Sequence, residues 1–98
     1  MPWTVQLENI DGTKASEYAV CPSDLLPLEN CAFPILGYVD PDNDTVFSSV
    51  QMIPFLREWS LIRRRATELG QMDSWTFVHA LALRCKGEID LYLRFVGG

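Results

Sequence analysis

Residues 54–70, PFLREWSLIRRRATELG, carry the clearest pattern in the chain and predict an α-helix. Apolar side chains recur there at spacings of four and three, at Phe55, Trp59, Ile62, Ala66 and Leu69. This spacing places all five on one stripe of a helix, which would pack against a core. Pro54 suits the first helical position, where its missing N–H loses no partner. Gly70 suits the position just after a helix, where the backbone commonly takes a left-handed conformation.

Two further elements are predicted on the C-terminal side of this helix. Asp73-Ser74 offers an N-cap for a second helix over residues 75–86. Its apolar face would hold Phe77, Val78, Leu81, Ala82 and Cys85. A strand is the alternative, because Thr-Phe-Val-His is β-prone, but the Ala- and Leu-rich run 80–84 favours a helix. Residues 89–95 alternate apolar and polar, which predicts a strand with one buried face and a candidate for a central place in the sheet.

The N-terminal half predicts shorter extended segments. Residues 3–8 alternate in the same way, and a turn at Asp11-Gly12 leads to a returning strand at 16–20. Residues 21–34 hold three prolines, which predicts an ordered loop with one helical turn at Ser23–Leu26. Residues 35–39 predict a strand, 40–44 a polar turn, and 45–47 the start of an extended segment that continues towards Ile53.

This order of elements predicts an α+β fold. We expect an antiparallel or mixed sheet of about four to five strands, covered on one face by two helices. The 98 residues are 48% hydrophobic and 21% charged, as in ordinary globular proteins. That length and composition predict one domain over residues 1–98.

The charge is distributed unevenly along the chain, whose net charge is −5. Residues 1–53 hold eight acidic side chains and one basic side chain, Lys14, whereas residues 54–98 hold five acids and seven bases. An acidic half repels phosphate, so we expect no nucleic-acid partner. No apolar run reaches the roughly 18 residues of a membrane span, so we expect no membrane partner. The start lacks a secretory pattern and the three cysteines form no CxxC pair, which predicts a cytoplasmic chain with reduced thiols.

Several chemistries are not expected from the motifs present. Asp40, Asp42 and Asp44 imitate the first ligands of a calcium loop, but Thr45 and Gln51 stand where that loop needs Gly and Glu. His79 is the only histidine, too few for a histidine metal site. No phosphate-binding glycine loop or serine elbow occurs. We therefore expect no catalytic residue, no metal and no cofactor.

Surface charge and shape then become the expected means of recognition. We expect a protein partner, a basic one, to contact Asp40, Asp42 and Asp44. Trp75 at the start of the second helix, expected to be only partly covered, and Leu83 on its polar side are apolar candidates for a partner or a homo-oligomer. Arg63–Arg65 point in directions spread over about 200°, so we expect them to pair with acids of the chain or with an acidic partner. The alternative for the acids is that they only maintain solubility.

In size, acidity and lack of a catalytic set, the chain resembles toxin-neutralising immunity proteins in type, though not by any motif. This predicts a small, non-catalytic, bacterial interaction or accessory protein. The alternative comes from residues 93–98, LRFVGG, which resemble the tail of ubiquitin-like modifiers and sulfur carriers. That resemblance implies that the terminal glycines pass through a narrow enzyme channel. In that family a hairpin is followed closely by the main helix, whereas here the proline-rich residues 21–34 take that position.

Overall fold

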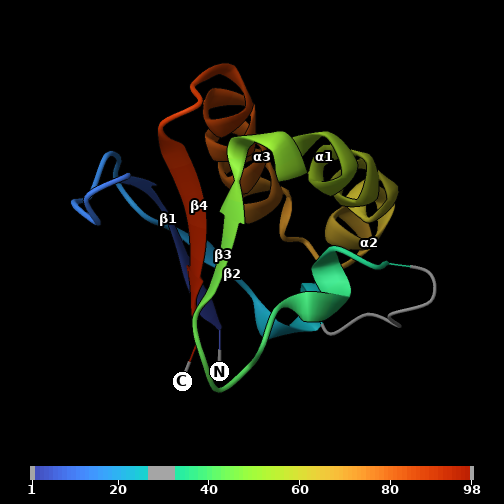
Figure 1. The fold of residues 1–98 in the computed structure, drawn as a ribbon. Coiled ribbons are helices and arrows are strands. Elements are labelled where there is room, and N and C mark those ends of the chain that lie inside the picture. Colours follow the sequence, from blue (N-terminus) through green and yellow to red (C-terminus); the bar gives the residue numbers. More distant parts are fainter. Residues whose placement is uncertain (1, 27–32, 98) are drawn as a thin grey trace.

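A computed structural model describes residues 2–26 and 33–97 and shows an α+β fold, as predicted (Figure 1). Its four strands are β1 (Trp3–Asn9), β2 (Ala19–Cys21), β3 (Thr45–Ser48) and β4 (Leu91–Val96). The helices are α1 (Met52–Leu61), α2 (Arg63–Glu68) and α3 (Met72–Gly87). Three short 3₁₀ turns are η1 (Ser23–Leu25), η2 (Leu36–Tyr38) and η3 (Ser49–Gln51). The described residues surround one hydrophobic core.

The sheet has the order β2-β1-β4-β3, and every neighbouring pair is antiparallel. The central position predicted for the C-terminal strand is confirmed, since β4 pairs with β1 on one side and β3 on the other. Alternate residues point into the core, namely Trp3, Val5, Leu7, Leu91, Leu93 and Phe95. The helices lie on this buried face (Figure 1). The opposite face is partly exposed, and β2 and β3 are its outer strands.

The helix predicted over residues 54–70 exists, but it begins at Met52, so the prediction of Pro54 as its first residue is wrong. It is also interrupted at Ile62 (φ −95°, ψ 5°). The Trp59 carbonyl accepts a hydrogen bond from the indole N–H of Trp75 at 2.9 Å. In an unbroken helix this carbonyl would accept the backbone N–H of Arg63 instead. Four of the five stripe residues are buried, and Leu69 is the exception at 42% exposed because it lies past the last turn. Gly70 ends the helix at φ +69°, as predicted. Gln71 N–H donates to the Ala66 carbonyl (2.8 Å), which completes a Schellman cap.

The second helix is confirmed, and the strand alternative for residues 75–86 is wrong. α3 begins three residues earlier than expected, at Met72. Val78, Leu81, Ala82 and Cys85 are buried as predicted, but Phe77 is 41% exposed. Phe77 lies about 100° around the helix from Val78, off the buried stripe. Trp75 occupies that stripe instead, so the expectation that its ring is only partly covered is also wrong.

Two predictions of extended structure are wrong. Residues 35–39 are not a strand and contain the 3₁₀ turn η2, because Glu58 of α1 accepts the N–H groups of Ile35 and Leu36 that a sheet would need. The segment that begins at Thr45 is a strand only to Ser48. There a reciprocal capping box starts helical structure, in which Ser48 N–H donates to Oε1 of Gln51 at 2.7 Å. The helical turn at residue 23 is confirmed as η1, whereas Cys31 and the rest of 27–32 lie outside the described residues.

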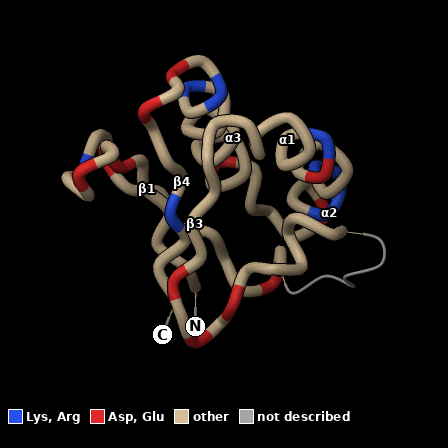
Figure 2. The backbone as a smooth tube through the Cα atoms, in the orientation of Figure 1, with Lys and Arg blue, Asp and Glu red and all other residues tan. Residues whose placement is uncertain are grey.

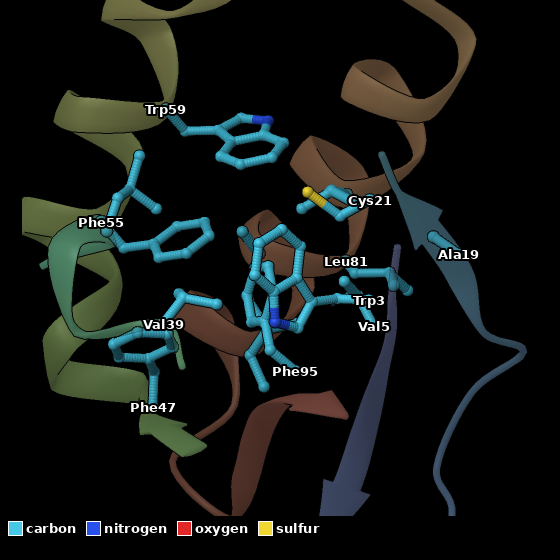
Figure 3. Packing of buried hydrophobic residues seen from close by; sticks show 14 of the residues in the cluster. Trp3, Val5, Ala19, Cys21, Val39, Phe47, Phe55, Trp59, Leu81 and Phe95 are labelled. Carbon is cyan, nitrogen blue, oxygen red and sulfur yellow. The ribbon is translucent and has the colours of Figure 1, made fainter. Parts of the chain in front are cut away.

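Aromatic rings join the sheet to the helices at the centre of the molecule (Figure 3). Phe55 of α1 contacts Phe47 of β3 and Phe95 of β4 at centroid distances of 5.5 and 6.0 Å. It also stacks on Trp59 at 5.6 Å, and Trp59 in turn stacks on Trp75 at 6.3 Å. No helix within the described ranges is long and apolar enough to cross a membrane.

Candidate functional site

A groove of about 510 Å³ follows the outer edge of β3. One wall is the strand itself and the other is η2, and the Asp40–Asp44 turn closes one end. Its lining residues are Ile35, Tyr38, Asp40, Asp44, Thr45, Val46, Phe47 and Gln51. Tyr38 is 74% exposed and Val46 is 42% exposed, so two large apolar side chains face solvent at this groove. The site therefore combines apolar surface, a sheet edge and carboxylates.

The η2 wall is held in place by Glu58, a carboxylate that is only 6% exposed. Its two oxygens accept Ile35 N–H at 3.0 Å each, and Oε1 also accepts Leu36 N–H at 2.8 Å. A buried carboxylate needs such donors, and hydrogen bonds to charged groups are the stronger ones. At the other end of η2, the Thr45 hydroxyl accepts Asp40 N–H (3.1 Å) and donates to the Tyr38 carbonyl (3.4 Å). The groove is therefore pre-formed by contacts from α1 and β3.

The acidic end of the groove is an ordered turn. Asp40 accepts the backbone N–H of Asp42 at 2.8 Å and the side-chain amide of Asn43 at 3.2 Å. These two hydrogen bonds, the first one most strongly, lower the pKa of Asp40 below its ordinary value. The Trp3 indole donates to the Asp40 carbonyl at 2.9 Å, which fastens the turn to β1. The turn thus keeps a negative charge and a fixed shape.

Asp44 is tied to the opposite, partly exposed face of the sheet. Its carboxylate accepts hydrogen bonds from Nη1 of Arg94 at 3.0 Å and from the backbone N–H of Gly97 at 3.3 Å. Arg94 also donates through Nε to Glu8 at 2.7 Å, and this hydrogen bond is the main reason that its pKa is raised. Asp44 therefore has an internal partner that sequence proximity did not reveal. Asp42, in contrast, forms no ion pair with any residue in 2–26 or 33–97.

Figure 2 shows where the charged residues gather along the backbone. The turn between η2 and β3 is acidic, whereas arginines gather on α1 and α2. These arginines are occupied in different ways. Arg64 pairs with Glu68 at 3.2 Å, Arg65 donates to the Asp24 carbonyl at 2.9 Å, and Arg63 lies 5.6 Å from the Trp75 ring. Each of these three arginines therefore has a different neighbour among the described residues.

The remaining candidate residues lie away from the groove. Trp75 is 6% exposed and stacks between Trp59 and His79, so it offers little surface to a partner. Leu83 is 49% exposed on α3 but does not line the groove. Burial raises the pKa of the Cys21 thiol to about 12 and that of Cys85 to about 11. Over the described ranges no three His, Cys, Asp or Glu side chains are grouped to hold a metal ion.

Sequence reasoning found the acidic turn but missed the apolar part of the site. Tyr38 and Ile35 were expected in a strand, where they would have alternated between faces. The role of Glu58 was not predicted either: its carboxylate accepts the backbone N–H groups of Ile35 and Leu36. The signals for a non-strand segment were Pro34 before it and Gly37 within it.

Comparisons of the chain with protein-family models, with curated proteins and with solved structures found no match.

Proposed function

We propose that this chain is a small, non-catalytic cytoplasmic protein that binds another protein at the groove beside β3, and that the bound surface is positively charged. The observation that carries the proposal is the groove itself, in which exposed apolar side chains at a sheet edge adjoin a pre-formed acidic turn. Apolar burial supplies affinity, and complementary charge speeds encounter and selects the partner. A basic enzyme neutralised by an immunity-type protein of bacterial origin is a partner of this kind.

The alternative function, a ubiquitin-like or sulfur-carrier role, gains no support from the surroundings of Gly97. A Cβ atom at Gly97 would come within 2.6 Å of the Asp40 carbonyl oxygen and still closer to that of Asn43. The backbone at Gly97 therefore lies too close to the acidic turn for a side chain. This close approach accounts for a glycine at the position, and passage through an enzyme channel is not needed to explain it. The main helix also does not follow the β1–β2 hairpin, since η1, η2 and β3 come first.

Site-specific photo-crosslinking in the native host tests the proposed function. A photoreactive phenylalanine analogue replaces Tyr38 in one variant and Leu61 in a matched control, since both side chains are well exposed at 74% and 65%. We expect one protein to be crosslinked from Tyr38 and not from Leu61, and the yield to fall as salt is raised. Equal crosslinking from both positions, or none from Tyr38, would contradict the proposal.

A further inference from the structure

We propose that the groove binds an extended peptide segment of the partner, which adds to the sheet as an antiparallel strand beside β3 and places a lysine or arginine next to the acidic turn. This inference rests on the proposed function and specifies its partner segment. Binding by strand addition derives affinity from main-chain hydrogen bonds and specificity from alternate side chains.

The backbone of Val46 supplies the open pairing position. Ser48 N–H donates to the Gln51 side chain, so it points away from β4. In an antiparallel ladder, residues alternate between pairing with the neighbour and facing outwards, so Val46 two positions earlier also presents its N–H and C=O to the outer edge. Val46 makes no backbone hydrogen bond outside the sheet to any residue that the structure describes. An incoming residue opposite Val46 can exchange both bonds with it.

The edge of β3 has little of the protection that outer strands usually carry. Residues 45–48, TVFS, contain neither lysine nor proline, which proteins place on edges to prevent strand addition. The two ends are occupied, because Gln51 caps Ser48 and the Thr45 hydroxyl contacts η2. Between them lies Val46, in the groove lined by Tyr38 and Ile35. The geometry therefore leaves one open backbone position flanked by apolar surface.

The acidic turn sets the direction and the charge of the segment. Thr45 begins β3 directly after the turn, so an antiparallel strand would bring its C-terminal end towards Asp42. Asp42 is exposed and forms no internal ion pair within the described chain, so its charge remains available to a cation. Asp44 is held by Arg94, and Asp40 by its own turn, so Asp42 is the one acid whose replacement leaves internal contacts intact.

The test uses the full chain and a capped heptapeptide of alternating valine and threonine that ends in two lysines. Nuclear magnetic resonance titration with isotope-labelled protein should move the Val46 amide most and slow its hydrogen exchange. Methylating the peptide nitrogen that faces the Val46 carbonyl removes one hydrogen bond and should weaken binding about tenfold. Replacing the two lysines with glutamates, or Asp42 with Asn, should weaken binding and reduce its salt dependence.

A pair of protein variants isolates the backbone contribution. Val46→Pro removes the outward N–H and should abolish binding, whereas the matched variant Val46→Thr keeps that donor and should still bind, weakened only by the exchange of one methyl group of the groove for a hydroxyl. If Val46→Pro does not fold, the methylated peptide against the unaltered chain decides the point. Equal affinity for the plain and methylated peptides, an unprotected Val46 amide, or no binding at about 1 mM peptide would overturn strand addition. If any of these results is found while crosslinking from Tyr38 succeeds, strand addition is wrong and the proposed function is retained. If the crosslink from Tyr38 fails as well, strand addition and the proposed function are both contradicted.

Discussion

At the scale of single residues, Glu58 joins the helical layer to the groove wall. Its carboxylate is buried and accepts the N–H groups of Ile35 and Leu36. Truncating the Glu58 side chain leaves these two backbone donors without an acceptor. A buried donor without a partner costs more free energy than the hydrogen bond itself contributes in net terms to folding.

Glu58→Ala should therefore lower the free energy of unfolding by about 2–4 kcal/mol, measured by urea denaturation. The matched control is Glu68→Ala, which removes only the exposed ion pair with Arg64 and should change stability by less than about 0.5 kcal/mol. An equal effect of the two substitutions would show that Glu58 does not hold η2.

Asp40 provides a prediction about pH. Its folded-state pKa is lowered from the usual 3.8, so its hydrogen bonds stabilise the fold above the unfolded pKa and are lost as pH falls through the folded value. We expect its carboxyl resonance to titrate below that of an aspartate in an unfolded peptide. Asn43→Ala should move the titration part of the way back, because the backbone N–H of Asp42 remains. A carboxyl that titrates at the ordinary value would contradict the described turn.

At the scale of elements, Trp59 and Trp75 connect α1 to α3. Each indole N–H donates to the other residue's carbonyl, at 3.1 and 2.9 Å, and the rings stack. The pair satisfies two buried donors and fills the space between the helices. It also accounts for the interruption of the helix at Ile62.

Trp59→Ala should destabilise the fold by about 3–5 kcal/mol, since it opens a cavity and removes the hydrogen bond from the Trp59 indole N–H to the Trp75 carbonyl. Urea denaturation measures this change, and Leu61→Ala serves as the control on the same helix because Leu61 is 65% exposed. A loss of less than about 1 kcal/mol for Trp59→Ala would be inconsistent with the buried stripe.

The ends of the helices differ in what they require of glycine. Gly70 has φ +69°, whereas Gly87 lies within α3 and has no positive φ. Gly70→Ala should cost about 1 kcal/mol, and Gly87→Ala should be neutral or slightly stabilising. Thermal melts of the two variants compare them directly, and a Gly70→Ala variant as stable as the parent would argue against the left-handed cap.

At the scale of the whole molecule, the acidic turn fastens both ends of the described chain. Trp3 of β1 donates to the Asp40 carbonyl, and Gly97 donates to Asp44 just after β4. The first and last described residues lie beside this turn (Figure 1). The turn is thus part of the fold as well as of the proposed site, which is why Asp42 is the cleanest position at which to test its charge.

The core thiols report on opening of the whole molecule. Cys21 and Cys85 are buried, and their pKa values near 12 and 11 leave almost no thiolate at pH 8. In a Cys31→Ser background, we expect both thiols to react with a disulfide reagent at the rate of global unfolding. Reaction within seconds in a chain that unfolds slowly would indicate that the core opens locally near one of them.

The sequence by itself determined the elements whose signals are local. The alternation in β1 and β4 follows from burial of one face, the stripe of α1 and α2 from the helical period, and the left-handed cap from Gly70. The acidic turn was also predictable, because Asp-Pro-Asp-Asn-Asp favours a turn whatever surrounds it. These features depend on neighbours within a few residues.

Only the tertiary structure decided the features that need a distant partner. Residues 35–39 have strand-forming side chains, but Glu58 accepts the N–H groups of Ile35 and Leu36, and a 3₁₀ turn forms at Leu36–Tyr38. Asp44 appeared unpaired until β4 brought Arg94 beside it, 50 positions along the chain. The groove exists because β3 is an outer strand with η2 opposite, and strand order is fixed by packing of the whole core, which no local pattern encodes.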